Sequence, residues 1–344
     1  MEAWFTIEPF GEHLTIRPGE SVLAAVLRQG RFVRHGCKHG GCGACRALLV
    51  SGECHLSDRT SFSLSDSDRE AGIVLLCSTY VSGSEAVFDV SGHMDLTADE
   101  FMAGSQIAEY RAEVTTIELL TPDIRAVRLH LLEPREMKFT AGQYMEIEVP
   151  GDHDQWRSFS MSSDPEDAGN LEIIVKVIPD GRFSSALDGR LCAGHRLRVR
   201  GPFGQFAVRL SHRPLVMVAG GSGIGPIRSM LRVLCRTGNT RRVTLCYGAR
   251  RARDLLFVDE LRAIEQAHDW FTFVPALSEP EPGVTWDGET GLIAEVVGRV
   301  FPSLRGTEGY LCGPPTMVDA ALETLVAAGC KERHIYFDRF VPSG

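Results

Sequence analysis

The sequence has 344 residues, of which 44% are hydrophobic and 24% are charged, as is typical of a globular protein with two or three domains. Its net charge of -9 argues against nucleic-acid binding, and no run of 18 apolar residues is present that could span a membrane. The N-terminus has no basic stretch followed by an apolar one, so we expect a cytoplasmic protein without a secretory signal.

The acidic charge is concentrated at the front of the sequence. The first hundred residues hold 8 Lys and Arg against 14 Asp and Glu. An acidic excess in this region would either steer a partner protein or serve solubility alone, and the sequence leaves both interpretations open.

The first hundred residues contain short alternating segments, the pattern of strands with one buried face. Trp4–Ile7 and His13–Ile16 predict a hairpin, and Ser21–Gln29 predicts a short helix with Ser21 as its N-cap. Further strands are predicted over Arg46–Val50 and Ala86–Val90. These elements predict a small sheet with one helix, arranged around a loop rich in cysteine and glycine.

Four of the 10 cysteines form a pattern. Cys37, Cys42 and Cys45 have the C-x4-C-x2-C spacing of a plant-type [2Fe–2S] cluster, and Cys77 follows in an apolar, strand-like segment. Three thiolates on one short loop must wrap the cluster while backbone amides turn towards its sulfurs, a conformation that glycine permits. The glycines of this loop are Gly36, Gly40, Gly41 and Gly43. We therefore predict that the four cysteines are the metal ligands.

Other cysteine chemistry fits the spacing less well. A zinc site would show paired C-x2-C knuckles and fewer glycines. A Rieske centre needs two Cys–His pairs, and the available ones, which begin at Cys37 and Cys192, lie about 150 residues apart. Cys54 competes with Cys77 as the fourth ligand, but it lies on a predicted turn only nine residues after Cys45.

The second region consists of closely spaced strands separated by glycine and proline turns, as in a small antiparallel barrel. A polar stretch at 96–107 precedes it and is expected to be a linker. The predicted strands are Arg111–Leu119, Ala126–Leu132, Gln143–Val149, Leu171–Val177 and Arg196–Arg200.

Two motifs in this barrel point to a flavin. Because alternate residues of a strand share a face, Arg157 and Phe159 would present a cation for pyrophosphate beside a ring for stacking. Gly181-Arg-Phe-Ser-Ser185 opens a helix-like run whose amides and hydroxyls suit a phosphate. Arg157-Ser-Phe-Ser160 resembles the R-x-Y-S flavin motif of the ferredoxin reductase family. Phe159 stands in the place of the tyrosine, so the ring is kept but the tyrosine hydroxyl is absent. The resemblance implies FAD contacts from Arg157, Ser158, Phe159, Ser160, Lys176, Gly181, Phe183, Ser184 and Ser185, with Ser160 reaching flavin N5.

From residue 214 onwards strands and helices alternate, which predicts a parallel sheet covered by helices on both faces. Ligands of such sheets bind at the carboxyl ends of the strands. The predicted elements are Leu215–Ala219, Pro226–Arg236, Val243–Gly248, Phe257–Ala267, Phe271–Ala276, Ile293–Val300, Tyr310–Cys312 and Met317–Ala328.

A glycine-rich loop, Gly220-Gly-Ser-Gly-Ile-Gly-Pro226, follows the first of these strands. Its amides and the helix after it would favour a pyrophosphate. The loop resembles the G-x-G-x-x-P loop of the ferredoxin reductase family, and Tyr310-Leu-Cys-Gly-Pro-Pro-Thr-Met317 resembles its C-G-P-P-x-M segment. The resemblance implies nicotinamide-cofactor contacts from Gly221, Ser222, Gly223, Pro226, Tyr247, Gly248, Arg250, Cys312, Gly313 and Pro314. Tyr247-Gly-Ala-Arg250, followed by Asp254 and Leu255, looks like the members of this family that use NADH, so the resemblance favours NADH over NADPH. Arg250, Arg251 and Arg253 would, however, also suit a 2′-phosphate.

In the order of its motifs, the whole sequence resembles the reductase components of bacterial multicomponent oxygenases. The resemblance implies a β-grasp [2Fe–2S] domain at 1–95, a linker at 96–107, an antiparallel FAD barrel at 108–210 and an α/β NAD domain at 211–344. Electrons would pass from NADH to FAD and on to the cluster, with Ser160 and Cys312 as catalytic residues and Phe340 near the flavin. The partner would be a separate hydroxylase, and the free chain is expected to be a monomer.

Within that class the sequence looks nearest to the reductases of soluble diiron monooxygenases. Leu23-Ala-Ala-Val-Leu-Arg-Gln-Gly30, Gly142-Gln-Tyr-Met and the ending Ile335-Tyr-Phe-Asp-Arg-Phe340 suggest this. Reductases that serve Rieske dioxygenases share the layout and remain an alternative. A redox-sensing protein whose cofactors gate binding without turnover is a third interpretation.

Overall fold

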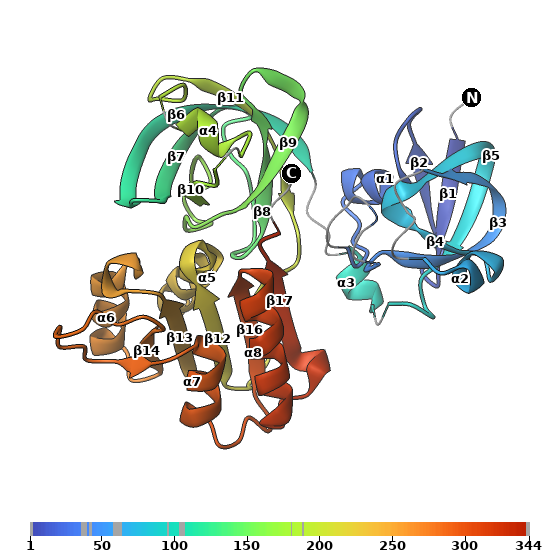
Figure 1. Cartoon of the computed structure of the whole chain (residues 1–344). Helices are drawn as coiled ribbons and strands as arrows, with labels where there is room; N and C mark the ends of the chain where they lie inside the picture. The colour runs from blue at the N-terminus through green and yellow to red at the C-terminus, as the bar shows by residue number, and fades with distance from the viewer. Residues whose placement is uncertain are drawn as a thin grey trace. The chain divides into compact units, whose positions relative to one another are not determined.

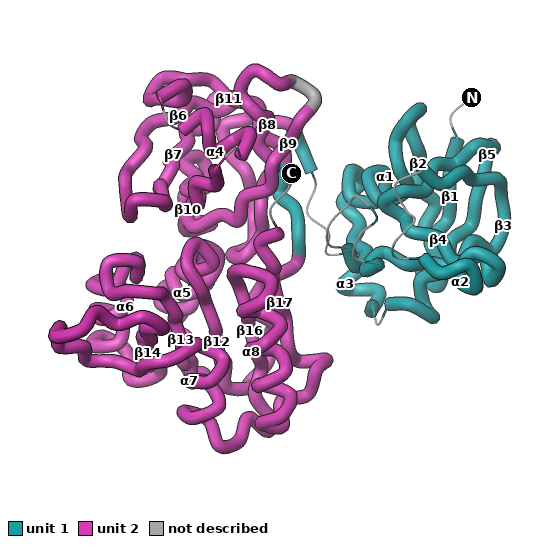
Figure 2. Tube along the Cα trace, viewed as in Figure 1, with its two compact units in different colours: residues 1–108, 201–204 teal, residues 109–200, 205–344 magenta. Residues whose placement is uncertain are grey.

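The computed structural model describes residues 3–35, 40, 43–57, 64–94, 96–102, 107–179, 181–187 and 189–341. The chain divides into two compact units, one of residues 1–108 and 201–204 and the other of residues 109–200 and 205–344 (Figure 2). Within the described ranges, no helix is long and apolar enough to cross a membrane.

The first unit is built on a five-stranded sheet (Figure 1). Its elements are β1 (Ala3–Glu8), β2 (Glu12–Ile16), α1 (Val22–Arg28), β3 (Arg46–Leu56), α2 (Asp66–Glu70), β4 (Ile73–Leu75), β5 (Thr79–Asp89) and α3 (Ala98–Met102). The strand order is β2-β1-β5-β3-β4, in which β1 is parallel to β5 and the other pairs are antiparallel. Ser21 caps α1, as predicted, by accepting a hydrogen bond from the Ala24 amide at 3.3 Å.

Part of the segment expected to be a linker is packed into the first unit. Phe101 of α3 is fully buried, and its ring stacks on that of Phe10 with centroids 4.3 Å apart. The Phe32 amide donates to the Phe101 carbonyl at 2.8 Å. This helix therefore belongs to the core of the first unit, and the exact domain boundaries stay predictions.

A curled antiparallel sheet of residues 108–203 forms the first half of the second unit, except that residues 108 and 201–203 are grouped with the first unit. Its elements are β6 (Ala108–Thr121), β7 (Ile124–Glu133), β8 (Tyr144–Val149), β9 (Asp152–Ser160), β10 (Asn170–Lys176), α4 (Ser184–Leu187) and β11 (Arg196–Phe203). The strand order is β10-β7-β6-β11-β8-β9. Met161, just after β9, forms an antiparallel bridge with Ile173 of β10, so the two outer strands meet and the sheet closes into a barrel.

A six-stranded parallel sheet forms the other half, with the order β15-β14-β13-β12-β16-β17. Its strands are β12 (Leu215–Gly220), β13 (Val243–Ala249), β14 (Phe271–Leu277), β15 (Glu289–Thr290), β16 (Glu308–Gly313) and β17 (Ile335–Arg339). Its helices are α5 (Ile224–Arg236), α6 (Val258–Ala267), α7 (Ile293–Val300) and α8 (Pro315–Ala327). All the predicted elements of this region are present, whereas β15 and β17 were not foreseen.

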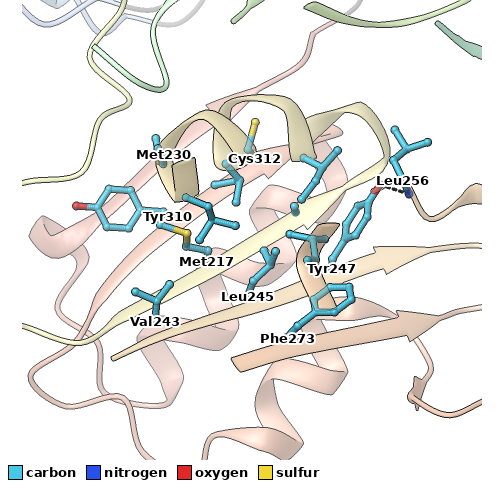
Figure 3. Packing of buried hydrophobic residues seen from close by; sticks show 14 of the residues in the cluster. Met217, Met230, Val243, Leu245, Tyr247, Leu256, Phe273, Tyr310 and Cys312 are labelled. Atoms are coloured by element: carbon cyan, nitrogen blue, oxygen red, sulfur yellow. Dashed lines mark hydrogen bonds between the residues drawn. The ribbon is translucent and has the colours of Figure 1, made fainter. Parts of the chain in front are cut away.

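Two apolar cores sandwich this parallel sheet. The strands are buried on both faces, and successive residues of β12 alternate between the cores: Met217 lies in one and Val218 in the other. The first core includes Met230 and Leu231 of α5 and is drawn in Figure 3. The sheet is thus packed on both faces, and the loops described next follow the ends of β12, β13 and β16.

Candidate functional site

Two of the four predicted cluster ligands lie in the described part of the chain, and both are buried. Cys45 is 3% exposed and Cys77 is 7% exposed, and both belong to the apolar core of the first unit. Cys45 precedes β3 and Cys77 follows β4, and Arg46 is paired with Leu75 across these strands. The Leu76 amide donates to the Cys45 carbonyl at 2.9 Å. The two thiols therefore come to the same end of the sheet.

The described part of the loop before Cys45 has a backbone that suits a cluster. Gly40 and Gly43 are left-handed, with φ angles of 87° and 69°, which a side chain would strain. The buried thiols and this glycine loop fit a [2Fe–2S] cluster. Cys54, the competing fourth ligand, lies within β3 and is paired with Val81. The predicted loop residues Gly36, Cys37, Gly41 and Cys42 lie outside the described residues.

The predicted flavin motif lies at the end of β9, on the second unit. Phe159 is half-buried, and its ring centroid lies 4.7 Å from that of Phe183, which is buried. Arg157 precedes Phe159 on the same face of the strand, and its Nη1 donates to the Trp156 carbonyl at 2.9 Å. An aromatic surface beside a cation suits the ring and the pyrophosphate of a flavin nucleotide. Ser158, which lies between Arg157 and Phe159, is exposed on the other face of the strand.

Ser160 joins the barrel to the parallel sheet. Its Oγ donates a hydrogen bond to Oδ2 of Asp338 on β17 at 2.9 Å, and Asp338 is paired with Cys312 across β17 and β16. Burial raises the pKa of Asp338 to about 6, and the hydrogen bond from Ser160 opposes this shift. Burial and the charge of Asp338 raise the pKa of the Cys312 thiol, which is therefore protonated at neutral pH. Asp338 is thus the neighbour of both residues predicted to be catalytic, Ser160 and Cys312.

Asp338 is a candidate functional residue that the sequence analysis did not assign. It is partly buried, and the partner that the described residues give its carboxylate is the uncharged Ser160 rather than an arginine or lysine, which is unusual. The sequence feature that could have indicated Asp338 is an acidic residue among the aromatic residues of Ile335–Phe340. Without β17 in the predicted fold, nothing in the sequence placed this ending beside Ser160.

The predicted phosphate loop uses its first serine internally. Ser184 is buried, and its hydroxyl donates to the Ile178 carbonyl at 2.9 Å and accepts from the Ile178 amide at 3.1 Å. A Cβ at Gly181 would overlap the Ser184 hydroxyl, so this glycine permits the contact. Ser185 is half-buried and accepts from Arg190 at 3.1 Å. Ser184 thus shapes the loop, while Ser185 and Arg190 offer polar groups to a phosphate.

Lys176, another residue predicted to contact FAD, forms an ion pair with an aspartate in this structure. It is exposed at the end of β10, where its Nζ lies 3.5 Å from Oδ2 of Asp123. Such an exposed pair is weak and leaves the lysine able to change partners. Its predicted contact with FAD stays a prediction.

The glycine-rich loop connects β12 with α5 and lies against the end of β16. Gly221 is left-handed with a φ of 55°, and the place of its missing Cβ is open. A Cβ at Gly223 would overlap the carbonyl oxygen of Cys312. Ser222 in the same turn is buried. Since only glycine fits at Gly223, the amides before α5 are brought to the strand ends, as a pyrophosphate would require.

Tyr247 of β13 supports the glycine loop from the apolar core beneath it. It is fully buried in the core drawn in Figure 3, and its hydroxyl donates to the Gly221 carbonyl at 3.0 Å and accepts from the Leu256 amide at 3.3 Å. Burial raises its pKa, so the hydroxyl stays protonated. Tyr247 thus holds the glycine loop in place, and its predicted role in cofactor binding stays a prediction. Of its predicted neighbours, Gly248 packs against Ile293 of α7, and Arg250 is exposed beyond the strand.

The remaining predicted residues lie at the end of β16. Cys312 is fully buried beside the glycine loop, and Gly313 accepts a hydrogen bond from the Phe340 amide at 2.9 Å. Pro314 is the N-cap of α8, and Pro226 lies in the first turn of α5. The loop, Cys312 and the chain ending that carries Asp338 and Phe340 therefore converge on one edge of the sheet, facing Ser160. This arrangement fits a nicotinamide brought to a flavin.

Three family models match consecutive parts of the chain. A 2Fe-2S iron-sulfur cluster binding domain matches residues 5–82, an oxidoreductase FAD-binding domain residues 111–208, and an oxidoreductase NAD-binding domain residues 217–323. Together with the sheets described above, these matches confirm the predicted fold class and the three cofactors. They also confirm that the chain is an oxidoreductase.

Characterised proteins resemble the chain over nearly its whole length. The reductase component of propane 2-monooxygenase from Rhodococcus jostii (strain RHA1) is 37% identical over 97% of this chain and 90% of its own. The reductase component of phenol 2-monooxygenase from Pseudomonas sp. (strain CF600) is 34% identical over 97% and 93%. Among solved structures, the cytochrome P-450 reductase of Amycolatopsis has a TM-score of 0.89 with 29% identity, covering 99% of this chain and 100% of that one. With three cofactor-binding regions in this order, the chain belongs to the reductase components of multicomponent oxygenases, iron–sulfur flavoproteins that draw electrons from NADH.

Proposed function

We propose that this protein carries electrons from NADH through FAD and a [2Fe–2S] cluster to the hydroxylase of a soluble diiron monooxygenase. The observation that carries the proposal is the occurrence of all three cofactor regions in one chain that aligns over 97% of its length with a monooxygenase reductase component. FAD, when bound, would supply the exchange between a two-electron hydride donor and a one-electron acceptor.

The chain's own residues position the donor and the acceptor. We assign the nicotinamide to the strand edge formed by Gly221–Gly223, Cys312 and Gly313, and the flavin ring to the face of Phe159. Ser160 and Asp338 then lie where charge changes during the transfer. A hydrogen bond from Ser160 fixes the orientation of Asp338, and the buried position of Cys312 keeps water from this side of the site.

The ferredoxin region delivers the electrons. We assign Cys37, Cys42, Cys45 and Cys77 as the cluster ligands, in keeping with the burial of Cys45 and Cys77 at one end of their sheet. The acidic charge of the first hundred residues makes this region a candidate docking surface for the hydroxylase. The chain itself would not touch the organic substrate.

The identity of the partner is proposed from the relatives. Those named as propane, phenol and xylene/toluene monooxygenase components are 31–37% identical over 97–98% of this chain. A Rieske dioxygenase is the second candidate, because the ferredoxin reductase of carbazole 1,9a-dioxygenase has a TM-score of 0.78 with 28% identity. The shared layout explains this likeness, whereas the sequence identity favours the monooxygenase.

Reconstitution with purified oxygenases tests the partner. We expect a diiron hydroxylase with its effector protein to oxidise substrate in step with NADH consumption when this reductase is added. A Rieske dioxygenase of similar redox potential serves as the control and should show at least tenfold slower turnover. The reverse preference would contradict the proposed partner but leave the NADH–FAD–cluster relay intact.

We further propose that the free protein is a cytoplasmic monomer. Sedimentation of the cofactor-loaded protein tests its state, with one species at the mass of a single chain as the expected result. A stable dimer at micromolar concentration would contradict it.

A further inference from the structure

Arg228 is a buried cation that the predicted cofactor sites do not account for. It lies on α5, two residues after the glycine loop, and its side chain is 8% exposed. Its guanidinium forms an ion pair with Glu172 of β10 and another with Glu260 of α6, the latter at 2.8 Å. It also donates to the Ser162 hydroxyl at 3.2 Å and lies 4.0 Å from the ring centroid of Phe257. One side chain thus joins α5, α6 and the barrel.

Arg228 binds the barrel at the seam where it closes. Met161 forms the bridge to Ile173 there, and the Ser162 amide donates to the Glu172 carbonyl at 2.7 Å. Ser162 belongs to the segment that continues directly from the flavin motif at the end of β9. Through Ser162 and Glu172, Arg228 therefore contacts both strands of the seam, one of which carries the flavin motif.

Neighbouring residues of α5 strengthen this attachment. The Ser229 hydroxyl, fully buried, donates to the Ser163 carbonyl at 2.7 Å. The place of a Cβ on Gly225 lies 3.4 Å from Ile174 of β10, which is ordinary contact. The beginning of α5, which follows the glycine loop without a break, is therefore packed on the barrel seam.

The ion pair is better suited to fixing a geometry than to adding stability. Burial alone would raise the pKa of Glu172, but the hydrogen bond from Arg128 and the charge of Arg228 hold it below its ordinary value. A buried ion pair loses about as much in desolvation as it gains in attraction, so an apolar replacement of both partners is often no less stable. Its directional hydrogen bonds, however, favour one placement of α5 against the seam.

We propose that Arg228 is a positioning residue for hydride transfer: by holding α5 on the barrel seam, it sets the approach of the nicotinamide to the flavin. The proposal rests on the function proposed above, in which the glycine loop carries the nicotinamide cofactor and β9 carries the flavin. The loop and the flavin motif lie on the two structures that Arg228 joins. Reacting atoms must come within about 3–3.5 Å, and a displacement of about 1 Å is costly, so a change in this joint affects the rate directly.

The main test is anaerobic, single-turnover reduction of the FAD-loaded protein by NADH. In Arg228→Met, which keeps length but removes charge, we expect the limiting rate to fall about 10–100-fold while the NADH concentration at half-saturation changes much less. Arg228→Lys should recover part of the rate, since one ammonium cannot make all the contacts of the guanidinium. Arg232→Met is the matched control: Arg232 lies on the same helix and pairs with the same Glu260 at 3.3 Å, and its rate should stay within twofold.

A second readout does not depend on turnover. Amide hydrogen exchange of residues 224–236 should be faster in Arg228→Met than in the wild-type protein. In Arg232→Met, the exchange of the amides at the beginning of α5 should be unchanged. The double variant Arg228→Met/Glu172→Gln should recover most of the unfolding temperature lost in Arg228→Met, because it also removes the buried charge of Glu172, which has lost Arg228 and keeps Arg128 as a partner. Its limiting rate should stay low.

These outcomes separate positioning from plain stability. If the double variant recovers both the unfolding temperature and the limiting rate, or if Arg228→Met reduces its flavin as fast as the wild-type protein, the proposal is overturned. Failure of the proposed function looks different, since NADH would then not reduce the flavin of the wild-type protein at all.

Discussion

At the scale of single residues, the most informative contact is the hydrogen bond from Ser160 to Asp338. It joins residues 178 positions apart and places a carboxyl with a pKa of about 6 beside a buried thiol. A carboxyl whose pKa is raised on folding binds more protons in the folded state, so it lowers stability as the pH rises from about 4 to about 6. Asp338 is thus maintained at a cost, as expected of a functional residue.

Replacing Asp338 with asparagine should reveal that cost. At pH 8, Asp338→Asn should be more stable than the wild-type protein by about 1–2 kcal/mol, because no charge is then buried. At pH 5 the wild-type carboxyl is largely protonated and the difference should shrink by about half. Thermal unfolding of both proteins at the two pH values measures it. An equal difference at pH 5 and pH 8 would show that Asp338 does not titrate in this range.

The fourth cluster ligand can be tested by a matched pair of cysteine variants. Cys77→Ser should lose the visible absorbance and the electron paramagnetic resonance signal of the reduced cluster, because Cys77 lies beside Cys45 at the end of the sheet. Cys54→Ser should keep both, since Cys54 lies within β3 and is paired with Val81. The opposite pattern would make Cys54 the ligand.

At the scale of elements, the sequence predicted the alternating strands and helices of residues 215–328, apart from the two-residue strand β15, because each has a clear period and a clear stop. It also placed the glycine loop directly after a strand, and it treated the flavin motif as extended chain without including β9 among the predicted strands. It did not predict β17, because Ile335–Arg339 mixes aromatic and charged residues without alternation. Nor did it predict the buried contacts of Arg228 or Asp338. These contacts join distant segments, and only the closed barrel and the strand order bring them together.

The glycine loop gives a prediction at this scale. In Gly223→Ala the new Cβ would overlap the Cys312 carbonyl oxygen, so the loop must move away from β16. We expect the KM for NADH to rise at least about tenfold in the ferricyanide assay, the equivalent of about 1.4 kcal/mol of binding free energy. Gly298→Ala on α7, whose new Cβ would lie 3.5 Å from Thr324, is the control and should leave the KM unchanged. Equal KM values for the two variants would contradict the proposed loop contact.

At the scale of the whole molecule, the chain has two compact units. In the proposed function, one unit binds NADH, which donates two electrons together, and the other releases them one at a time from the cluster. Flavin and nicotinamide regions share one unit, whose barrel seam and α5 are joined by buried polar contacts. The cluster cysteines belong to the other. Such a division suits a relay in which hydride transfer needs fixed geometry, while the cluster region must meet a separate protein.

The order of the carriers is the central claim, and Cys45→Ser tests it most directly. The measurement is NADH-driven reduction of cytochrome c and of ferricyanide by the FAD-loaded variant, compared with the wild-type protein. In the proposed order, cytochrome c takes electrons from the cluster and ferricyanide takes them from the flavin. We therefore expect cytochrome c reduction to fall at least tenfold while ferricyanide reduction stays within twofold. Loss of both activities in a folded variant with full FAD content, or retention of both, would contradict the order NADH, FAD, cluster.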